Sequence, residues 1–335
     1  MYSNIPTIDF SRFLDGSIED RQQTVSEVDN ALKTIGFLHL DNHGIEQEKV
    51  DTFFEWSKRF FNLSEHEKET LCPTPQSFGQ RYFGVGKESI RGQTCMKESF
   101  DFRNPKNNSF GSWPDEKQLP GFCDFAADFY QACTELIDKL LECLSISLNL
   151  RPEESLGQHH TGSMFVSSLI HYPAVPAQLI RSGKVVRNPA HSDFGTLTLL
   201  FQRNVGGLEI ADMSSTDKSS STGVEKSGKF IYVGPKPGSI LVNVGYLLMR
   251  WTNGRWKNTV HRVSEPPHPV SNKVAQETGD QEIIPERYSI AFFSFPDEVT
   301  IVEPFTSCCN DQTPKRWGPI NAGQYLLKKR ADLYF

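Results

Sequence analysis

The sequence lacks long hydrophobic runs, and no stretch of about 18 or more apolar residues offers a helix that could span a membrane. Its first ten residues, MYSNIPTIDF, have neither the basic segment nor the apolar core of a signal peptide. Clusters of Lys and Arg are also missing, and the net charge of −6 argues against binding to a phosphate backbone. We therefore expect a cytoplasmic protein with neither a membrane nor a nucleic-acid partner; the sequence does not indicate its oligomeric state.

Cysteine is scarce and irregularly placed. There are seven cysteines, an odd number, and no CxxC pair, with only Cys308 and Cys309 adjacent. A disulfide framework or a zinc-thiolate site requires closely matched pairs. The cysteines are therefore expected to be free thiols that pack as small apolar side chains.

The apolar pattern divides the chain, which has no internal repeat, into an α-rich first half and a β-rich second half. Apolar residues at helical spacing predict helices over 17–35, 45–62 and 120–149. From about residue 160 the period changes to two, and about eight short strands follow, separated by Gly, Pro and polar loops. This order favours a mainly β fold with α, in which a sandwich or barrel holds a ligand at its open end.

Two polar stretches interrupt the strand pattern. Residues 213–228 and 266–285 are rich in Ser, Lys, Glu and Gly, and neither has enough apolar residues to form a core. We predict that both are surface insertions, and that the second influences substrate choice at the mouth of the barrel.

The segment NPAHSDFGTLTLLF, residues 188–201, places a His and an Asp just before an alternating strand. Alternation directs positions i and i+2 to one face, so His191 and Asp193 can reach the same metal ion. A third ligand must come from elsewhere, and His261 in TVHRV lies in another short strand 70 positions later. Two His and one carboxylate on one face are typical of non-haem Fe(II) oxygenases, although spacing alone leaves His261 open as an ordinary core histidine.

A second HxD pattern occurs near the start of the chain. His39 and Asp41, with His43 two positions further on, would also share one face. The sequence NHG is typical of a turn, the neighbouring residues are apolar, and no downstream partner is evident. We predict that this segment is a buried strand rather than a metal site.

A possible anion clamp lies in ERYSIAFFSFP. Arg287 and Ser289 alternate onto one face of a strand that begins 26 residues after His261. A guanidinium binds a carboxylate through two charge-assisted hydrogen bonds, and a hydroxyl adds a third. Taken alone, Arg287 leaves a second interpretation open, in which it forms a surface ion pair with Glu282 or Glu286.

Together, HSDFG, TVHRV, RYSIAFF, LIHYP and GFLHLDNHGI resemble the isopenicillin-N-synthase-like branch of the Fe(II)/2-oxoglutarate-dependent dioxygenases, in its fungal small-molecule form. The resemblance covers nearly the whole chain and implies a double-stranded β-helix (jelly-roll) core with an N-terminal α/β region and flanking helices. It divides the sequence into an N-terminal region (1–115), connecting helices (116–158), the Fe(II)/2-oxoglutarate domain (159–304) and a C-terminal helical tail (305–335).

The resemblance also implies the roles of the site residues. His191, Asp193 and His261 would hold Fe(II), while Arg287, Ser289 and Tyr172 would bind the far carboxylate of 2-oxoglutarate. With O2, the enzyme would oxidise a C–H bond of a small molecule in secondary or amino-acid metabolism, and ascorbate is an expected assay additive. Hydroxylation is the default outcome, while desaturation or cyclisation stays open.

Two positions depart from the pattern of the family. Tyr246 follows NVG where many relatives have Asp, and we expect metal binding to survive because this is not a ligand position. Ile170 replaces an Asn that is frequent in plant relatives, a change expected to alter the polar contacts near the co-substrate.

Candidate substrate contacts come from aromatic and polar residues near these motifs. Aromatic side chains beside the ligands can stack on a ring or pack an aliphatic chain, and an arginine can pair with a carboxylate. The candidates are Phe194, Phe293 and Ser168 near the ligands, and Tyr82, Phe83, Lys97, Phe102 and Arg103 as parts of a lid.

Three functions remain open from the sequence. The first is a 2-oxoglutarate-dependent oxygenase, the second is a related iron oxidase in which Arg287 and Ser289 bind the carboxylate of its own substrate, and the third is a non-catalytic barrel that binds a small molecule. The third is disfavoured because all three candidate metal ligands are present. Formation of succinate from 2-oxoglutarate would discriminate the first two.

Overall fold

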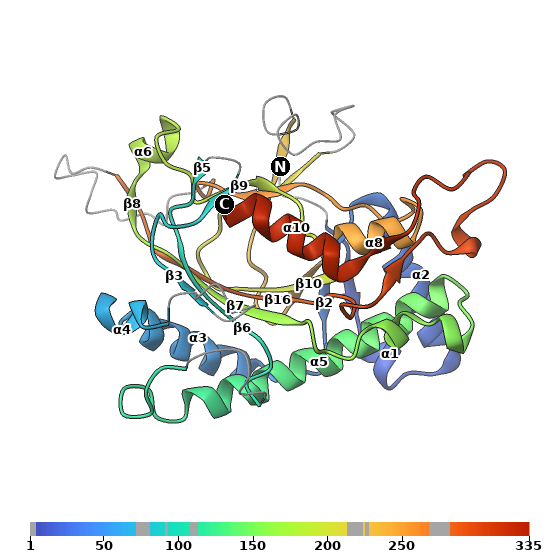
Figure 1. The fold of residues 1–335 in the computed structure, drawn as a ribbon, viewed down its shortest axis with the longest axis horizontal. Coiled ribbons are helices and arrows are strands. Elements are labelled where there is room, and N and C mark those ends of the chain that lie inside the picture. Colours follow the sequence, from blue (N-terminus) through green and yellow to red (C-terminus); the bar gives the residue numbers. More distant parts are fainter. Residues whose placement is uncertain are drawn as a thin grey trace.

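The computed structural model describes residues 5–71, 81–90, 93–106, 113–212, 224, 228–267 and 282–334 (Figure 1). Its largest feature is an eight-stranded sheet that is antiparallel except where β1 meets β2. The strands, in sheet order, are β1 (Thr7–Asp9), β2 (Phe37–Asp41), β13 (Ile240–Val244), β10 (Leu197–Gln202), β16 (Arg287–Phe293), β7 (Val166–Tyr172), β6 (Glu98–Phe102) and β3 (Arg81–Phe83).

A second sheet of four strands faces the first. Its order is β12 (Phe230–Val233), β11 (Leu208–Ala211), β14 (His261–Val263) and β9 (Asn188–His191). Residues from both sheets line one pocket, so the sheets form the two walls of a barrel. The predicted fold class, mainly β with α and with a ligand-sized opening, is confirmed.

Helices cover the outer face of the large sheet, below β7, β16 and β10 in Figure 1. The three predicted helices are present as α2 (Ile18–Thr34), α3 (Gln47–Phe61) and α5 (Phe122–Ser147). A capping box between Ser17 and Asp20 begins α2, because each side chain accepts a hydrogen bond from the other's backbone. Rings on α5 pack against the sheet: Tyr130 lies 5.0 Å from Phe292 between ring centroids. The face of the sheet under α5 is therefore core, and the opposite face is left for the pocket.

Shorter elements complete the described part of the chain. Residues 301–302 form a short strand that pairs outside the two large sheets. The remaining elements are α1 (Ser11–Leu14), α4 (Glu65–Glu69), α6 (Ala177–Arg181), α8 (Tyr246–Trp251) and α10 (Ala322–Tyr334), with the strand pairs β4 (Ser89–Ile90) and β5 (Gln93–Thr94), β8 (Val175–Pro176) and β15 (Ile283–Ile284), and β17 (Ile301–Val302) and β18 (Ile320–Asn321).

Strands from the N-terminal region extend the large sheet at both ends. β2 pairs with β13, and β6 pairs with β7, so the sheet crosses the predicted boundary at residue 115. The division into four sequence blocks therefore stays a prediction. In the last block, α10 is the one α-helix among the described residues.

The two polar insertions lie mostly outside the described residues. Val224, within the first, is fully buried against Ala190, Ala211 and Val260. For the end of the second insertion, the surface-loop expectation is wrong: Ile284 of β15 is buried, because it packs against Val175 while its strand pairs with β8.

No helix in the described ranges combines the length and the apolar character needed to cross a bilayer.

Candidate active site

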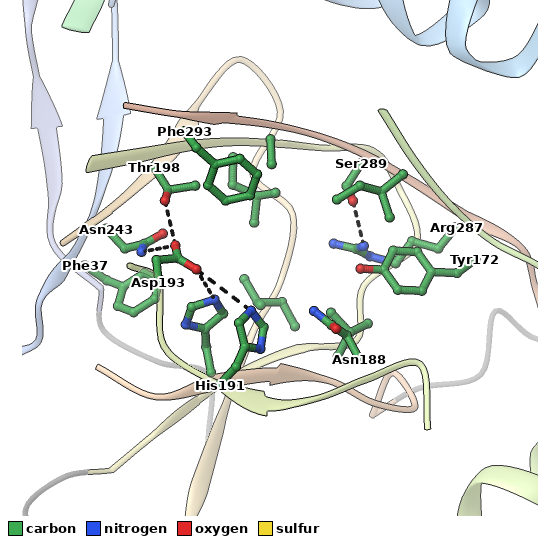
Figure 2. A pocket seen from close by; sticks show the side chains of 16 residues that line it. Phe37, Tyr172, Asn188, His191, Asp193, Thr198, Asn243, Arg287, Ser289 and Phe293 are labelled. Atoms are coloured by element: carbon green, nitrogen blue, oxygen red, sulfur yellow. Dashed lines mark hydrogen bonds and ion pairs between the residues drawn. The ribbon is translucent and has the colours of Figure 1, made fainter. Parts of the chain in front are cut away.

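A pocket between the two sheets brings the predicted ligands and the predicted anion clamp together. It encloses about 500 Å³, part of it open to solvent. Figure 2 shows Asp193 and His191 at one end and Arg287, Ser289 and Tyr172 at the other. The walls between these ends are largely apolar, with Ile170, Leu200, Leu208, Val263, Ala291 and Phe293.

Three candidate metal ligands converge at one end of the pocket. His191 of β9 lies directly opposite His261 of β14, and their ring centroids are 4.3 Å apart. Asp193 Oδ1 is 3.9 Å from His191 Nε2 and 3.6 Å from His261 Nε2. One donor atom from each residue lies within 4.8 Å of the other two, and no other such group of three was found among the described residues.

The backbone orients both imidazoles toward this point. His191 Nδ1 lies 2.8 Å from the Pro189 carbonyl oxygen, and His261 Nδ1 lies 3.2 Å from that of Thr259. A carbonyl only accepts, so each Nδ1 carries the proton and each Nε2 keeps its lone pair. Both histidines are therefore held in the tautomer that a metal requires.

Two further side chains orient Asp193. Thr198 Oγ1 donates to Asp193 Oδ2 over 2.6 Å, and Asn243 Nδ2 donates to the same oxygen over 2.8 Å. These bonds leave Oδ1 to face the histidines. Sequence reasoning did not identify Thr198 or Asn243 as site residues, because the strand pairing that places them beside Asp193 is not visible in the local pattern.

The charge states of His191 and Asp193 match those of metal ligands. Burial, followed by the charge of His261, lowers the pKa of His191 to about 4. Burial by itself raises the pKa of Asp193, but the nearby His261 and His191 and its two hydrogen bonds lower it below its ordinary value. Near neutral pH Asp193 is therefore a carboxylate and His191 a neutral imidazole. Together with His261, these residues fit a divalent ion and specifically the donor set of non-haem Fe(II).

The first turn of α8 holds the loop that carries Asp193 through backbone hydrogen bonds. The Tyr246 N–H donates to the Asp193 carbonyl over 2.8 Å, and the Leu247 N–H donates to that of Gly195 over 3.0 Å. A Cβ at Gly245 would lie 2.2 Å from the Gly195 carbonyl oxygen, so this close approach requires glycine. The Tyr246 ring stacks on Tyr325 of α10 at 5.1 Å, so the departure from the family's Asp serves to attach the C-terminal helix.

The other end of the pocket is cationic. Arg287 is 1% exposed, its Nη1 donates to Ser289 over 3.0 Å, and its Nη2 donates to Gln202 over 3.0 Å. Its guanidinium lies 4.9 Å from the centre of the Tyr172 ring. Burial lowers the pKa of Arg287 from its ordinary value. The pairing of β10 with β16 brings in Gln202, which sequence reasoning also missed.

A second buried arginine, Arg187, adds to this positive charge. It is fully buried, and its Nη2 donates to the Pro285 carbonyl over 2.5 Å. Burial and then the charge of Arg287 lower its pKa to about 10. The partners of both guanidiniums among the described residues are neutral oxygens rather than carboxylates, and both have a buried Nε without a hydrogen-bond partner there. Two buried cations that have no counter-charge in the described part of the chain fit an anion supplied by a ligand.

The candidate substrate residues separate into different environments. Phe293 lines the pocket, whereas Phe194 is half-buried and is not part of its lining. Ser168 donates a hydrogen bond to Asp101, and both residues lie on the face of the large sheet that is turned toward the pocket. The expectation for Phe102 is corrected: it is fully buried on the outer face, where it packs against Phe53, Trp113 and Tyr130.

The remaining candidates for a lid are held by other contacts. Arg103 is buried and donates to the Ser163 carbonyl and the Met164 sulfur. Tyr82 donates to Glu98 on the outer face, and Lys97 pairs with Glu88 at 2.7 Å. A substrate role for Arg103 stays a prediction.

The second HxD segment is the strand β2. His39 is buried, and burial lowers its pKa to about 4. Its Nδ1 lies 3.3 Å from Ser239 Oγ. His43 accepts a hydrogen bond from the Ile45 N–H over 3.2 Å at the turn.

Family models match two segments of the chain. Residues 5–120 match the N-terminal region of the non-haem dioxygenase in morphine synthesis, and residues 151–296 match the 2OG-Fe(II) oxygenase superfamily. The second match contains the three candidate metal ligands and the residues of the cationic end of the pocket.

Similar proteins cover the same length. The 2-oxoglutarate-dependent dioxygenase frbA of Dothideomycetidae sp. is 32% identical over 97% of both chains. The 2-oxoglutarate-dependent dioxygenase htyE of Aspergillus rugulosus is 32% identical over 98% of this chain and 99% of its own. Among solved structures, T7H of Neurospora crassa in complex with alpha-KG and thymine has a TM-score of 0.84 and 27% identity, covering 98% of this chain and 96% of that chain.

Proposed function

We propose that this chain, which belongs to the 2OG-Fe(II) oxygenase superfamily, hydroxylates a C–H bond of a small molecule held between the metal end of its pocket and Phe293. It is a 2-oxoglutarate-dependent dioxygenase that uses Fe(II), 2-oxoglutarate and O2 and oxidises a small molecule. The proposal adds the roles of individual residues and the type of reaction.

His191, Asp193 and His261 would hold Fe(II) through two Nε2 atoms and Asp193 Oδ1. The chemistry that Fe(II) supplies when bound is activation of O2 at the expense of 2-oxoglutarate, which leaves as succinate and CO2. Thr198 and Asn243 would keep the second Asp193 oxygen engaged, so that one oxygen faces the ion.

Arg287 would bind the far carboxylate of 2-oxoglutarate, with Ser289 and Tyr172 beside it. The observation that carries this proposal is the pair of buried guanidiniums, Arg287 and Arg187, which have no carboxylate partner among the described residues. Burying two uncompensated cations is costly, so their retention favours an anionic ligand at this end of the pocket. Ile170, an apolar wall residue, would exclude water near the co-substrate.

The substrate class that we propose is a small metabolite of secondary or amino-acid metabolism. T7H, which shares the fold over nearly its whole length, binds thymine, so a pocket of this architecture accommodates a small ring. Phe293, which lies directly opposite Thr198 on the neighbouring strand and close to the metal end in Figure 2, is placed to contact such a ring. We propose the cytoplasm as its location; in support, the six cysteines in the described part of the chain are all free thiols.

The decisive experiment measures succinate from 2-oxoglutarate in the purified protein supplied with Fe(II), O2 and ascorbate, first alone and then with a panel of metabolites. Stimulated succinate release together with a product 16 mass units heavier than the added compound would support hydroxylation. A product without succinate would instead support an oxidase that does not use 2-oxoglutarate, and a product two mass units lighter would indicate desaturation or cyclisation.

A further inference from the structure

A cluster of ionisable residues lies next to the pocket and takes no part in the proposed chemistry. It consists of Arg81, Glu88, Lys97, Asp101 and Ser168, here called the β6 polar cluster. Side-chain exposures of the four ionisable members range from 10% to 19%, and Ser168 is buried. Two acids and two bases in such a place are unusual beside a largely apolar barrel wall.

Strand pairing connects this cluster to the pocket. Leu200, Ala291, Ser168, Asp101 and Arg81 lie directly opposite one another on β10, β16, β7, β6 and β3. Residues in such a row share one face of a sheet. The first two members line the pocket, so the row passes from an apolar pocket wall at Ala291 to Ser168 and Asp101 within about 10 Å, and to Arg81 one strand further.

Asp101 has unused hydrogen-bonding capacity. Ser168 Oγ donates to its Oδ1 over 2.6 Å, while its Oδ2 lies 3.9 Å from Arg81 Nε, beyond hydrogen-bond distance. No hydrogen bond from a described residue to Oδ2 is present. Burial raises the pKa of Asp101, yet 19% of its side chain remains accessible. Asp101 and Ser168 lie beside the lining of the pocket rather than in it.

The charges around Asp101 are balanced. Lys97 and Glu88 form an ion pair of 2.7 Å. Because Glu98 lies opposite His171 in the pairing of β6 with β7, Lys97 and Tyr172 adjoin this pair at the same end of the two strands. The cluster thus extends toward the co-substrate end of the pocket. With two carboxylates and two cations its net charge is zero, which disfavours a charged ligand group. A carboxylate oxygen accepts hydrogen bonds and cannot donate them when ionised.

We propose that Asp101 and Ser168 form a substrate subsite that binds a neutral N–H group of the amide, lactam or imide type. This inference rests on the proposed function, because it names the substrate class of the same pocket. An apolar substrate would leave Asp101 Oδ2 desolvated without a hydrogen bond, and an anionic one would meet two carboxylates. An N–H donor satisfies Oδ2 directly.

The test uses phenylacetamide, its N,N-dimethyl derivative and phenylacetate, which differ in N–H content or charge, together with cyclo(Gly-L-Phe) and its N,N′-dimethyl derivative. Binding is measured by thermal shift and tryptophan fluorescence in the full chain loaded with Co(II) and N-oxalylglycine. Because a hydrogen bond to a charged group is involved, we expect the N–H compounds to bind at least about tenfold more tightly than their N-methylated counterparts.

Matched variants locate this preference. In Asp101→Ala the affinities for N–H and N-methylated compounds should differ by no more than about twofold. Ser168→Ala should weaken the preference for N–H compounds, and Asp101→Asn should keep part of this preference through its remaining carbonyl oxygen. Ser167→Ala is the control, because Ser167 is the adjacent residue on the opposite face and its buried hydroxyl has no hydrogen-bond partner there. It should leave the preference unchanged.

Several outcomes would overturn the subsite: equal binding of N–H and N-methylated compounds, binding of phenylacetate alone, no binding of either N–H compound, or a preference that persists in Asp101→Ala. Lower thermal stability of Asp101→Ala with an unchanged preference for N–H compounds would mean that the cluster stabilises the fold and does not bind substrate. This result would also refute the proposal. Failure of the proposed function has a separate sign: no succinate from Fe(II) and 2-oxoglutarate, whatever the binding preference.

Discussion

Glu98 and Asp101 are both carboxylates of β6, on opposite faces of the strand, and their surroundings differ. Glu98 faces the helices and accepts hydrogen bonds from Lys68 over 2.9 Å, Tyr82 over 2.5 Å and His171 over 2.7 Å. Asp101 faces the pocket side, accepts one bond from Ser168, and has its other oxygen unused by the described residues. A buried carboxylate whose hydrogen bonds are all made within the protein stabilises the fold. A carboxylate oxygen that is still free to accept a hydrogen bond next to a pocket is available to a ligand.

This contrast extends to the two sides of the large sheet. On the side of the pocket, the Nε of Arg287 has no hydrogen bond from the described residues. Neither do Asp193 Oδ1 and the two histidine Nε2 atoms, which reach the pocket from β9, the loop after it and β14 of the second sheet. On the other face, rings such as Phe292 pack against α5. Substitutions on the pocket face should therefore change function with little loss of stability, and substitutions on the helix-covered face should do the reverse.

The largest effect is expected from Asp193→Ala on the pocket face. It removes a donor and the negative charge of the ligand set, so we expect loss of Fe(II) and a decrease in turnover of at least about a thousandfold. Iron content after gel filtration and succinate release measure this, with the circular dichroism spectrum unchanged. His39→Ala, in the other HxD segment, should retain iron and turnover. Equal iron in wild type and Asp193→Ala would refute the ligand assignment.

Glu98→Ala tests the helix-covered face. It leaves Lys68, which is 3% exposed, with Glu65 as its one remaining carboxylate partner among the described residues. We expect the free energy of unfolding to fall by about 3 kcal/mol, because a buried charge loses its partner. Urea denaturation gives this value, and turnover per folded molecule should stay within about twofold. Glu65→Ala, at an exposed carboxylate, should cost less than about 1 kcal/mol.

The buried His160 should make the free energy of unfolding depend on pH. It is 5% exposed, donates from Nδ1 to the Leu156 carbonyl, and accepts from Thr196 at Nε2. Burial lowers its pKa to about 4, below the ordinary value of 6.5, so the unfolded chain takes up its proton first on acidification. The contribution is fully present above pH 6.5 and is lost as pH falls toward 4, by roughly 2 to 3 kcal/mol.

The check is urea denaturation of wild type and His160→Asn at several pH values, with EDTA present to remove metal. The variant should be less stable at pH 7.5 and should lose less stability than wild type on going to pH 5. Parallel curves for the two proteins would contradict the assignment to His160.

The smallest effect is expected from Arg287→Lys, which retains the charge but loses the two-pronged geometry. We expect KM for 2-oxoglutarate to rise by about tenfold, equivalent to about 1.4 kcal/mol, with iron content and unfolding free energy unchanged. Steady-state succinate formation measures it. An unchanged KM would mean that Arg287 binds a carboxylate of the substrate itself.

Much of the site could be predicted from local pattern. His191 and Asp193 are two residues apart on an extended segment, as are Arg287 and Ser289, and this spacing alone places each pair on one face. The long helix at 122–147 was equally visible, because its apolar stripe is local in sequence. Phe102 was assigned wrongly, because the face of β6 that meets the pocket depends on its register with β7.

The amino-acid sequence by itself determined the kind of chemistry that this protein can perform, because ligand type and strand periodicity are properties of short segments. The tertiary structure alone decided which residues support that chemistry. Thr198, Asn243 and Gln202 reach the site through strand pairing, and Arg187 through burial beside Arg287. Asp101 comes to lie on the pocket side of the large sheet through a row that spans five strands. Such contacts join segments far apart in the chain, and no local pattern encodes their register.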